Sequence, residues 1–288
     1  MLATPRMMSC PGRGSEPASE TIGVPAADDA TESHSVYQEV WSSLAASSSC
    51  GEAFYREGVL IASAGGTWPV MNTAFLSTPV ATEADLQDRI SVAKEYFGQK
   101  KTLWLFVAFD EWLDSLIQPE RLFRQNGLCH MQSCVGMQTK NLVVRTSPVP
   151  ELLFRPVTND VERLAFSSIN SDSYAFSAAW RSDIARWSSQ WPALKVRSYV
   201  GYSRNEAVTS AMVHLTGDVG FLGFVATKQG HQRNGFAEAI VRHALAAAES
   251  EWHVSKSILH STPAGLPLYR SLGYSEVTSF SIYLGGCE

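Results

Sequence analysis

The sequence predicts a protein of the mixed α/β (α+β) class with two units, and three observations support this prediction. Strand-like and helix-like patterns alternate on both sides of a Pro-containing segment at residues 147–157. In the second part, short turn signals separate three strand-like runs, as in an antiparallel meander. The chain has 288 residues, 45% of them hydrophobic, which suffices for about two cores. We therefore expect each unit to contain a mixed, mostly antiparallel sheet flanked by helices.

The first unit is expected at residues 36–148, after a disordered tail. Residues 1–35 are rich in Ser, Glu, Pro, Gly and Ala and contain almost no large apolar residues, so burial cannot offset their ordering entropy. Beyond the tail, apolar periodicity predicts alternating elements. In chain order they are a helix at 36–46, an apolar run at 58–64, a strand at 70–76, a helix at 81–97, a strand at 103–109, a short helix at 121–127 and a strand around 134–142.

The second unit is expected at residues 149–288. It begins with a helical region from Asp160 toward Trp191. The three strand-like runs follow, and after them come a helix that starts near Phe236 and a short strand. The strands are expected at 196–202, 207–215, 220–227 and 257–259.

Charge and hydropathy exclude several classes of protein. The net charge of −5 argues against a general nucleic-acid or anionic-membrane binder. The N-terminus lacks the apolar run of a signal peptide, and no stretch reaches the roughly 18 apolar residues of a membrane span. We therefore expect a cytoplasmic protein without nucleic-acid or membrane partners.

The five cysteines do not indicate a metal site. No pair has CxxC spacing, and none lies with histidines at zinc-ligand spacing. We expect no bound metal, and reduced thiols rather than disulfides.

A polar loop between a strand and a helix, at residues 228–237, has the features of an anion site. Amides of a first helical turn lack intrahelical partners and lie at the positive end of the helix dipole. Gly235 and Ala237 carry small side chains, so a diphosphate can approach this backbone. Basic residues add local positive charge at Lys228, His231, Arg233 and Arg242. The loop is not an NTPase P-loop, because Phe236 and Ala237 stand where Lys and Ser or Thr are required.

Two motifs in this region resemble those of the GNAT superfamily of N-acetyltransferases. The segment Gln232-Arg233-Asn234-Gly235-Phe236-Ala237 matches the Gln/Arg-x-x-Gly-x-Gly/Ala signature. About 30 residues further on, residues 262–274 (TPAGLPLYRSLGY) are similar to the second cofactor motif, with Leu-Tyr-x-x-Leu-Gly-aromatic in order. One departure is Gln229, where the family usually has proline, and we expect a slightly looser loop.

The resemblance implies acetyl-CoA as cosubstrate and assigns roles to particular residues. The main chain of Val225, Ala226 and Thr227 would pair with the pantetheine arm, and Thr262 would contact the pantetheine or thioester end. Tyr269 would donate a proton to the departing CoA thiolate. The pyrophosphate would be bound by the amides of Gln232, Arg233, Asn234, Gly235, Phe236 and Ala237.

Alternative roles remain open for two side chains. Tyr269 by itself would more often be a core aromatic residue, and the motif context is what favours a catalytic role. His214 lies on a predicted strand and is a candidate general base acting through water, although a lone histidine on a strand is more often structural.

The first unit is interpreted as a degenerate GNAT-like copy. Residues 122–128 (LFRQNGL) resemble 268–274 (LYRSLGY) at an offset of 146 residues from Leu122 to Leu268. Phe123 replaces the tyrosine, and residues 76–86 contain no pyrophosphate signature, so only the second unit is expected to bind acetyl-CoA. The rival explanation is a coincidence between two ordinary α/β patterns.

The sequence thus predicts an N-acetyltransferase that moves an acetyl group directly from acetyl-CoA to an amine. No cysteine lies near the motifs to form an acyl-enzyme, so sequential kinetics are expected. The acceptor is expected to be a small-molecule amine or a peptide, and the sequence specifies neither it nor the oligomeric state. The alternatives are a non-catalytic protein that binds acyl-CoA as a sensor or partner scaffold, and an interaction module without CoA.

Overall fold

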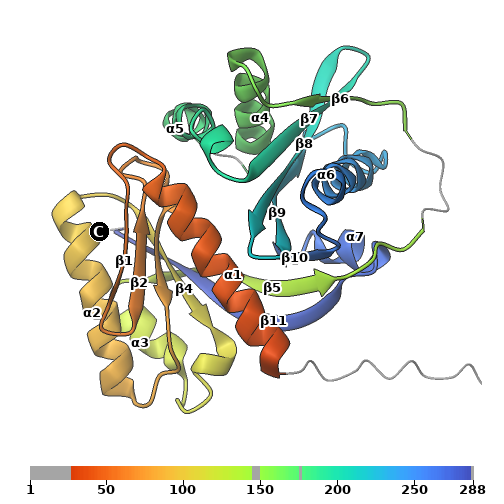
Figure 1. Cartoon of the computed structure of the whole chain (residues 1–288). Coiled ribbons are helices and arrows are strands. Elements are labelled where there is room, and N and C mark those ends of the chain that lie inside the picture. Colours follow the sequence, from red (N-terminus) through yellow and green to blue (C-terminus); the bar gives the residue numbers. More distant parts are fainter. Residues whose placement is uncertain (1–26, 145–149, 175–176, 287–288) are drawn as a thin grey trace, which may run out of the picture.

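The computed structural model of the chain describes residues 27–144, 150–174 and 177–286. Within these residues, the strands form one continuous sheet in the order β1-β2-β3-β4-β11-β5-β10-β9-β8-β7-β6 (Figure 1). The expected class is confirmed: only β3 with β4 and β9 with β10 pair in parallel, and the other neighbours are antiparallel. The sheets of the two halves are joined edge to edge.

The elements follow the predicted order, with a few additions. In the first half they are α1 (Ala27–Ala46), β1 (Glu52–Arg56), β2 (Val59–Ser63), β3 (Asn72–Leu76), α2 (Glu83–Lys100), β4 (Trp104–Phe109), α3 (Pro119–Gln125) and β5 (Cys129–Thr139). In the second half they are β6 (Leu153–Pro156), α4 (Asp160–Ser173), α5 (Ala178–Ser188), β7 (Val196–Ser203), β8 (Glu206–Thr216), β9 (Val219–Thr227), α6 (Phe236–Trp252), β10 (Lys256–Ser261), α7 (Leu266–Ser271) and β11 (Ser275–Gly285). The sequence patterns did not indicate β1, β6, α7 and β11.

Helices cover both faces of the sheet. On β2, Leu60 and Ala62 belong to the core beneath α1, α4 and α5, whereas Val59 and Ile61 belong to the core beneath α2 and α3. This alternation follows from the two-residue period of a strand. A third core lies beneath α6 and α7, in the second half of the sheet.

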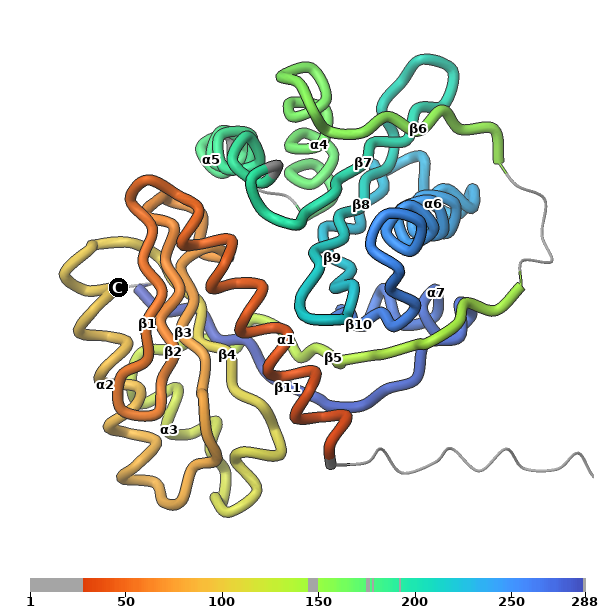
Figure 2. Tube along the Cα trace, viewed as in Figure 1, coloured from red at the N-terminus to blue at the C-terminus, as the bar shows by residue number. Residues whose placement is uncertain are grey.

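The two halves exchange their last strands. β11, from the end of the chain, pairs with β4 of the first half, and β5 of the first half pairs with β10 (Figure 2). The exchanged strands are also neighbours of each other in the middle of the sheet. They cover residues 129–139 and 275–285, which are related by the predicted offset of 146 residues. This relation supports the degenerate-copy hypothesis, and that hypothesis and the unit boundary at residues 148 and 149 stay predictions.

Helix α1 begins at Ala27, so the expectation of a tail through residue 35 is wrong for residues 27–35. Residues 1–26 lie outside the described part of the chain. Two buried polar side chains fasten the early turns of the helix to distant strands: Ser33 Oγ lies 3.0 Å from His260 Nε2, and His34 Nε2 lies 2.7 Å from Thr278 Oγ1. Composition suggested disorder because these contacts use polar rather than large apolar side chains.

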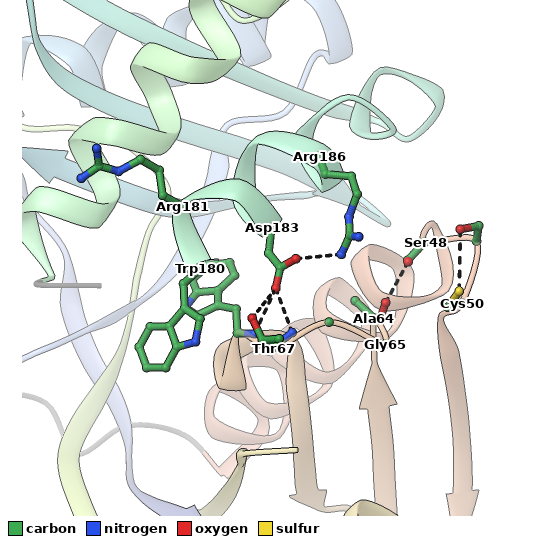
Figure 3. Close-up of polar contacts among 12 residues, drawn as sticks. Ser48, Cys50, Ala64, Gly65, Thr67, Trp180, Arg181, Asp183 and Arg186 are labelled. Atoms are coloured by element: carbon green, nitrogen blue, oxygen red, sulfur yellow. Dashed lines mark hydrogen bonds and ion pairs between the residues drawn. The ribbon is translucent and has the colours of Figure 1, made fainter. Parts of the chain in front are cut away.

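A buried carboxylate connects α5 to the first half (Figure 3). Asp183 Oδ2 accepts hydrogen bonds from the Thr67 amide (2.8 Å), the Thr67 hydroxyl (2.9 Å) and the Trp68 amide (3.3 Å). Its Oδ1 accepts from Arg186 Nη2 at 2.7 Å. Gly66 permits this close approach, because a Cβ there would lie 2.8 Å from Asp183 Oδ2. Asp183 therefore fixes the loop that carries Trp68 against the second half.

Replacing Asp183 with Ala is expected to lower the free energy of unfolding by about 2–4 kcal/mol, because buried donors lose a charged acceptor. The matched control is Arg186→Ala, which removes the mostly exposed partner of the same carboxylate and should cost under about 1 kcal/mol. Urea denaturation of both variants measures the difference. Equal losses of unfolding free energy in the two variants would contradict the role of Asp183 in connecting the two halves.

Candidate active site

The site begins where two parallel strands separate. β9 and β10 pair only from Val219 to Leu222 and from Lys256 to Leu259. Beyond this point β9 carries a bulge, marked by a register shift against β8 and by Phe224, whose φ is 51°. The following main chain, at residues 225–227, has no partner on β10. One edge of the strand is thereby open to an extended ligand.

The loop after β9 leads into α6, and the N-terminus of this helix has no side-chain cap. Gly235 is the N-cap of α6 with φ 74°, a conformation that glycine adopts without the strain of a Cβ, and no side chain caps the helix. The first-turn amides of α6 are therefore available to an anion, as the sequence predicted. Arg233, in the same loop, also has a left-handed backbone, with φ 63°.

The open strand edge and the open helix start share one cavity of about 600 Å³, which we call the cofactor cavity. Nearly all of the predicted site residues line it, namely Val225, Ala226, Thr227, Gln232, Arg233, Gly235, Phe236, Ala237, Thr262 and Tyr269. Asn234 does not line it, because its side chain turns back and donates to the His231 carbonyl at 3.1 Å. The fold thus brings together three segments that are separate in the sequence.

Two lining residues, Ser173 and Tyr174, lie outside both sequence motifs. Ser173 and Tyr174 lie at the C-terminal end of α4, and their hydroxyls donate to the carbonyls of Thr227 and Val225, both at 3.1 Å. No motif marks them, because α4 reaches β9 only through tertiary packing. They bind the same main chain that the resemblance assigns to pantetheine.

The local positive charge is smaller than the sequence suggested. Glu206 lies 3.4 Å from Lys228 Nζ and 3.3 Å from His231 Nε2, and Glu238 accepts from Arg242 Nε at 2.8 Å. Arg233 is exposed and makes no ion pair with any described residue. Of the four basic residues, Arg233 is therefore the one whose charge is available to a phosphate.

Tyr269 lies on α7 with its side chain on the cavity wall. It is 8% exposed, and its ring packs edge-on against Tyr274 with centroids 5.8 Å apart. Burial raises the pKa of the Tyr269 phenol above its ordinary value, so the hydroxyl keeps its proton at neutral pH. A protonated phenol beside the cavity is a hydrogen-bond donor.

His214 lies elsewhere. It is buried on β8, where Nε2 contacts Ser43 Oγ at 2.7 Å and Nδ1 contacts Thr216 Oγ1 at 3.1 Å, and it does not line the cofactor cavity. Burial lowers the pKa of His214 to about 4, so the imidazole is neutral at physiological pH. Its contacts favour the structural alternative over a general base.

The corresponding helix start in the first half is closed. Thr82 caps α2 by accepting from the Asp85 amide at 3.1 Å. Arg89 binds the Asp85 carboxylate at 2.7 Å and also donates to the loop carbonyls of Thr78 (2.6 Å) and Pro79 (3.0 Å). The hydrogen bond from Arg89 lowers the pKa of Asp85, so a carboxylate occupies this helix start. This arrangement supports the prediction that only the second half binds CoA.

No metal site or membrane helix is evident in the described residues. Within 27–144, 150–174 and 177–286, no group of three or more His, Cys, Asp or Glu side chains is placed to hold a metal ion. In the same ranges, no helix has the length and hydropathy that crossing a membrane requires.

A family comparison defines the class of the second half of the chain. The sequence profile of the acetyltransferase (GNAT) family matches residues 163–274, the segment that contains the separated strands β9 and β10 and the uncapped start of α6. This segment is a GNAT acetyltransferase domain. No protein with curated function matches the sequence.

Solved structures share the fold across both halves. A GCN5-related N-acetyltransferase from Kribbella flavida aligns with a TM-score of 0.65 at 14% identity, over 88% of this chain and 94% of its own. A functionally unknown conserved protein from Staphylococcus epidermidis aligns with a TM-score of 0.60 at 13% identity, over 82% and 94%. A GCN5-related N-acetyltransferase from Sphaerobacter thermophilus gives 0.52 at 12% identity, over 79% and 80%. At these identities the likeness concerns the fold alone.

Proposed function

We propose that the protein is an N-acetyltransferase that transfers the acetyl group of acetyl-CoA directly to an amine. The observation that carries this proposal is the cofactor cavity, which joins the uncapped start of α6, the main chain of β9 that β10 does not pair with, and the Tyr269 side chain. Each of these three parts suits a different part of acetyl-CoA: its pyrophosphate, its pantetheine amides and its thioester sulfur.

The lining residues fit this cosubstrate. The amides from Gln232 to Ala237 would bind the pyrophosphate together with the Arg233 guanidinium. The main chain of β9 would pair with the pantetheine amides as a neighbouring strand does. The Val225 carbonyl already accepts from Tyr174, but a carbonyl has two lone pairs and can accept a second donor. Thr262 would lie at the thioester end.

The proposed step is a single displacement. The neutral amine attacks the thioester carbonyl carbon, the C–N bond forms and the C–S bond breaks. The amine loses one proton and the sulfur gains one, so the products are an N-acetyl amide and the CoA thiol. The Tyr269 hydroxyl would donate to the sulfur as negative charge develops there.

Direct transfer is favoured over an acyl-enzyme. The fold brings Cys134 to the wall of a second cavity beside the site, which its position in the sequence did not suggest. Burial raises the pKa of the Cys134 thiol to about 12, so it is protonated and a poor nucleophile. Cys134→Ala should therefore retain kcat at saturating amine.

The test is a thiol-release assay with acetyl-CoA and a broad panel of amines, beside calorimetric binding of acetyl-CoA. We expect binding, amine-dependent release of the thiol, and intersecting initial-rate plots from a ternary complex. Binding of acetyl-CoA without thiol release for every amine would indicate a CoA-binding sensor instead of an enzyme. Loss of activity in Cys134→Ala, together with parallel initial-rate plots, would indicate a mechanism through an acyl-enzyme instead of direct transfer.

A further inference from the structure

A second cavity, of about 290 Å³, lies where the two halves meet, and we call it the acceptor cavity. Aromatic side chains from both halves form its walls: Tyr37, Trp41 and Trp68 from the first, and Phe221, Phe224 and Phe280 from the second. Tyr174 and Thr262 line both this cavity and the cofactor cavity. A group in the acceptor cavity therefore adjoins the end of the cofactor cavity where the thioester would lie.

The wall of the acceptor cavity carries no formal charge, because burial lowers the pKa of His260, the one imidazole among its described lining residues, to about 3 and keeps the ring neutral. Among the described residues, no Asp, Glu, Lys or Arg lines it. A ligand with several charges would lose its hydration there without gaining an opposite charge. Aromatic faces, in contrast, complement an apolar group by area and attract an ammonium group weakly through their quadrupoles.

Two buried polar atoms of residues on this wall, Asn170 Oδ1 and His260 Nδ1, have no hydrogen-bond partner among the described residues. Asn170 is fully buried, and its Nδ2 donates to the Phe166 carbonyl at 2.9 Å and to Ser210 Oγ at 3.1 Å. These bonds fix the orientation of the amide, because the Phe166 carbonyl can only accept. The remaining atom, Asn170 Oδ1, has no hydrogen-bond partner among the described residues. It is an acceptor suited to the N–H of an amine.

We infer that the acceptor is a small primary amine that bears an aromatic group and no second charge, of the arylalkylamine class. The inference rests on the proposed function and adds the substrate class. The aromatic cavity receives the ring, and Asn170 Oδ1 accepts one N–H. Burial favours the neutral amine, which is the form that attacks the thioester. The first half, whose own helix start is closed, then contributes to the enzyme by supplying half of the acceptor wall.

The first measurement compares amines on the full chain at saturating acetyl-CoA. 2-Phenylethylamine should have a kcat/KM at least about tenfold above those of spermidine and of a lysine-containing peptide, because the uncharged wall discriminates against further charges. Acetyl transfer to spermidine or the peptide at equal or higher kcat/KM would overturn the acceptor class and leave the proposed transferase function standing.

The second measurement uses a substitution that fills the cavity. Val70 is half-buried on the acceptor wall, and its carbonyl accepts from Trp41 Nε1 at 2.8 Å through the backbone, which Val70→Trp retains. The control, Ile117→Trp, alters a first-half side chain that is 83% exposed and lines neither cavity. Val70→Trp should raise KM for 2-phenylethylamine about tenfold and leave acetyl-CoA affinity unchanged, whereas the control should change neither.

Direct binding separates failure of this inference from failure of the proposed function. If no amine releases the thiol, calorimetric titration of wild-type protein with 2-phenylethylamine and with spermidine still decides the ligand class. Binding of 2-phenylethylamine that is stronger than that of spermidine and weakened by Val70→Trp supports the cavity assignment. Absence of binding, or an equal effect of the Ile117 control, overturns it. The wild-type titration needs no variant, so it decides even if Val70→Trp does not fold.

Discussion

Replacing Gly235 with Glu is expected to weaken acetyl-CoA binding at least about 100-fold. The side chain would place bulk and negative charge at the uncapped start of α6, where the pyrophosphate would lie. Loss of two hydrogen bonds to a charged acceptor, at about 1.5–3 kcal/mol each, corresponds to a weakening of this size. The wild-type protein should also gain thermal stability from acetyl-CoA, and the variant should not. Calorimetry and thermal melts measure both effects.

Backbone strain is the competing explanation for such a loss, and Gly217 provides the matched control. Gly217 also has positive φ, at 57°, but it is exposed in the turn between β8 and β9 with nothing within 4 Å of an added Cβ. Gly217→Glu therefore carries similar strain, of about 1–2 kcal/mol, outside the cofactor cavity. It should lose stability and keep acetyl-CoA binding. If both variants bind as wild type does, or if both lose binding equally, the pyrophosphate assignment is wrong.

Tyr269→Phe is expected to lower kcat about 10- to 100-fold, while acetyl-CoA affinity stays nearly unchanged. A donor to the departing sulfur acts in the transition state and barely in the ground state, so its loss appears in kcat. The effect should lie at the low end for an acid, because burial raises the pKa of the Tyr269 phenol and makes it a weaker proton donor than most general acids. The hydroxyl then stabilises the thiolate chiefly by hydrogen bonding.

Phe123 gives the reciprocal comparison, because the degenerate-copy hypothesis makes it the counterpart of Tyr269 in the first half. Its side chain is fully buried and stacks on Tyr283 with centroids 4.0 Å apart, and it lines neither the cofactor nor the acceptor cavity. Phe123→Tyr should leave kcat unchanged and cost about 1–3 kcal/mol of stability for burying a hydroxyl. An unchanged kcat in Tyr269→Phe, with a verified acceptor, would return Tyr269 to a packing role and leave the cofactor site intact.

The sequence by itself determined the parts of the site whose interactions are local. The run from Gln232 to Ala237 is predicted to form an anion site, because the turn, the left-handed glycine and the first helical amides all lie within a few residues of one another. Tyr269 could be identified for the same reason, since α7 and the glycine after it form one short motif. The order of strands and helices also followed, because hydrophobic periodicity is a local property.

Only the tertiary structure decided which distant segments complete the site. The exchange of β5 and β11 depends on pairing across the whole chain. β11 was not predicted because it places apolar side chains on both faces, with Phe280 in one core and Tyr283 in another, so its apolar residues do not mark a single face. The ordering of residues 27–35 rests on contacts such as that between His34 and Thr278, which lie 244 residues apart. The acceptor cavity has the same origin. Its walls come from both halves, and no local pattern in either one encodes a surface that exists only where the two halves pack together.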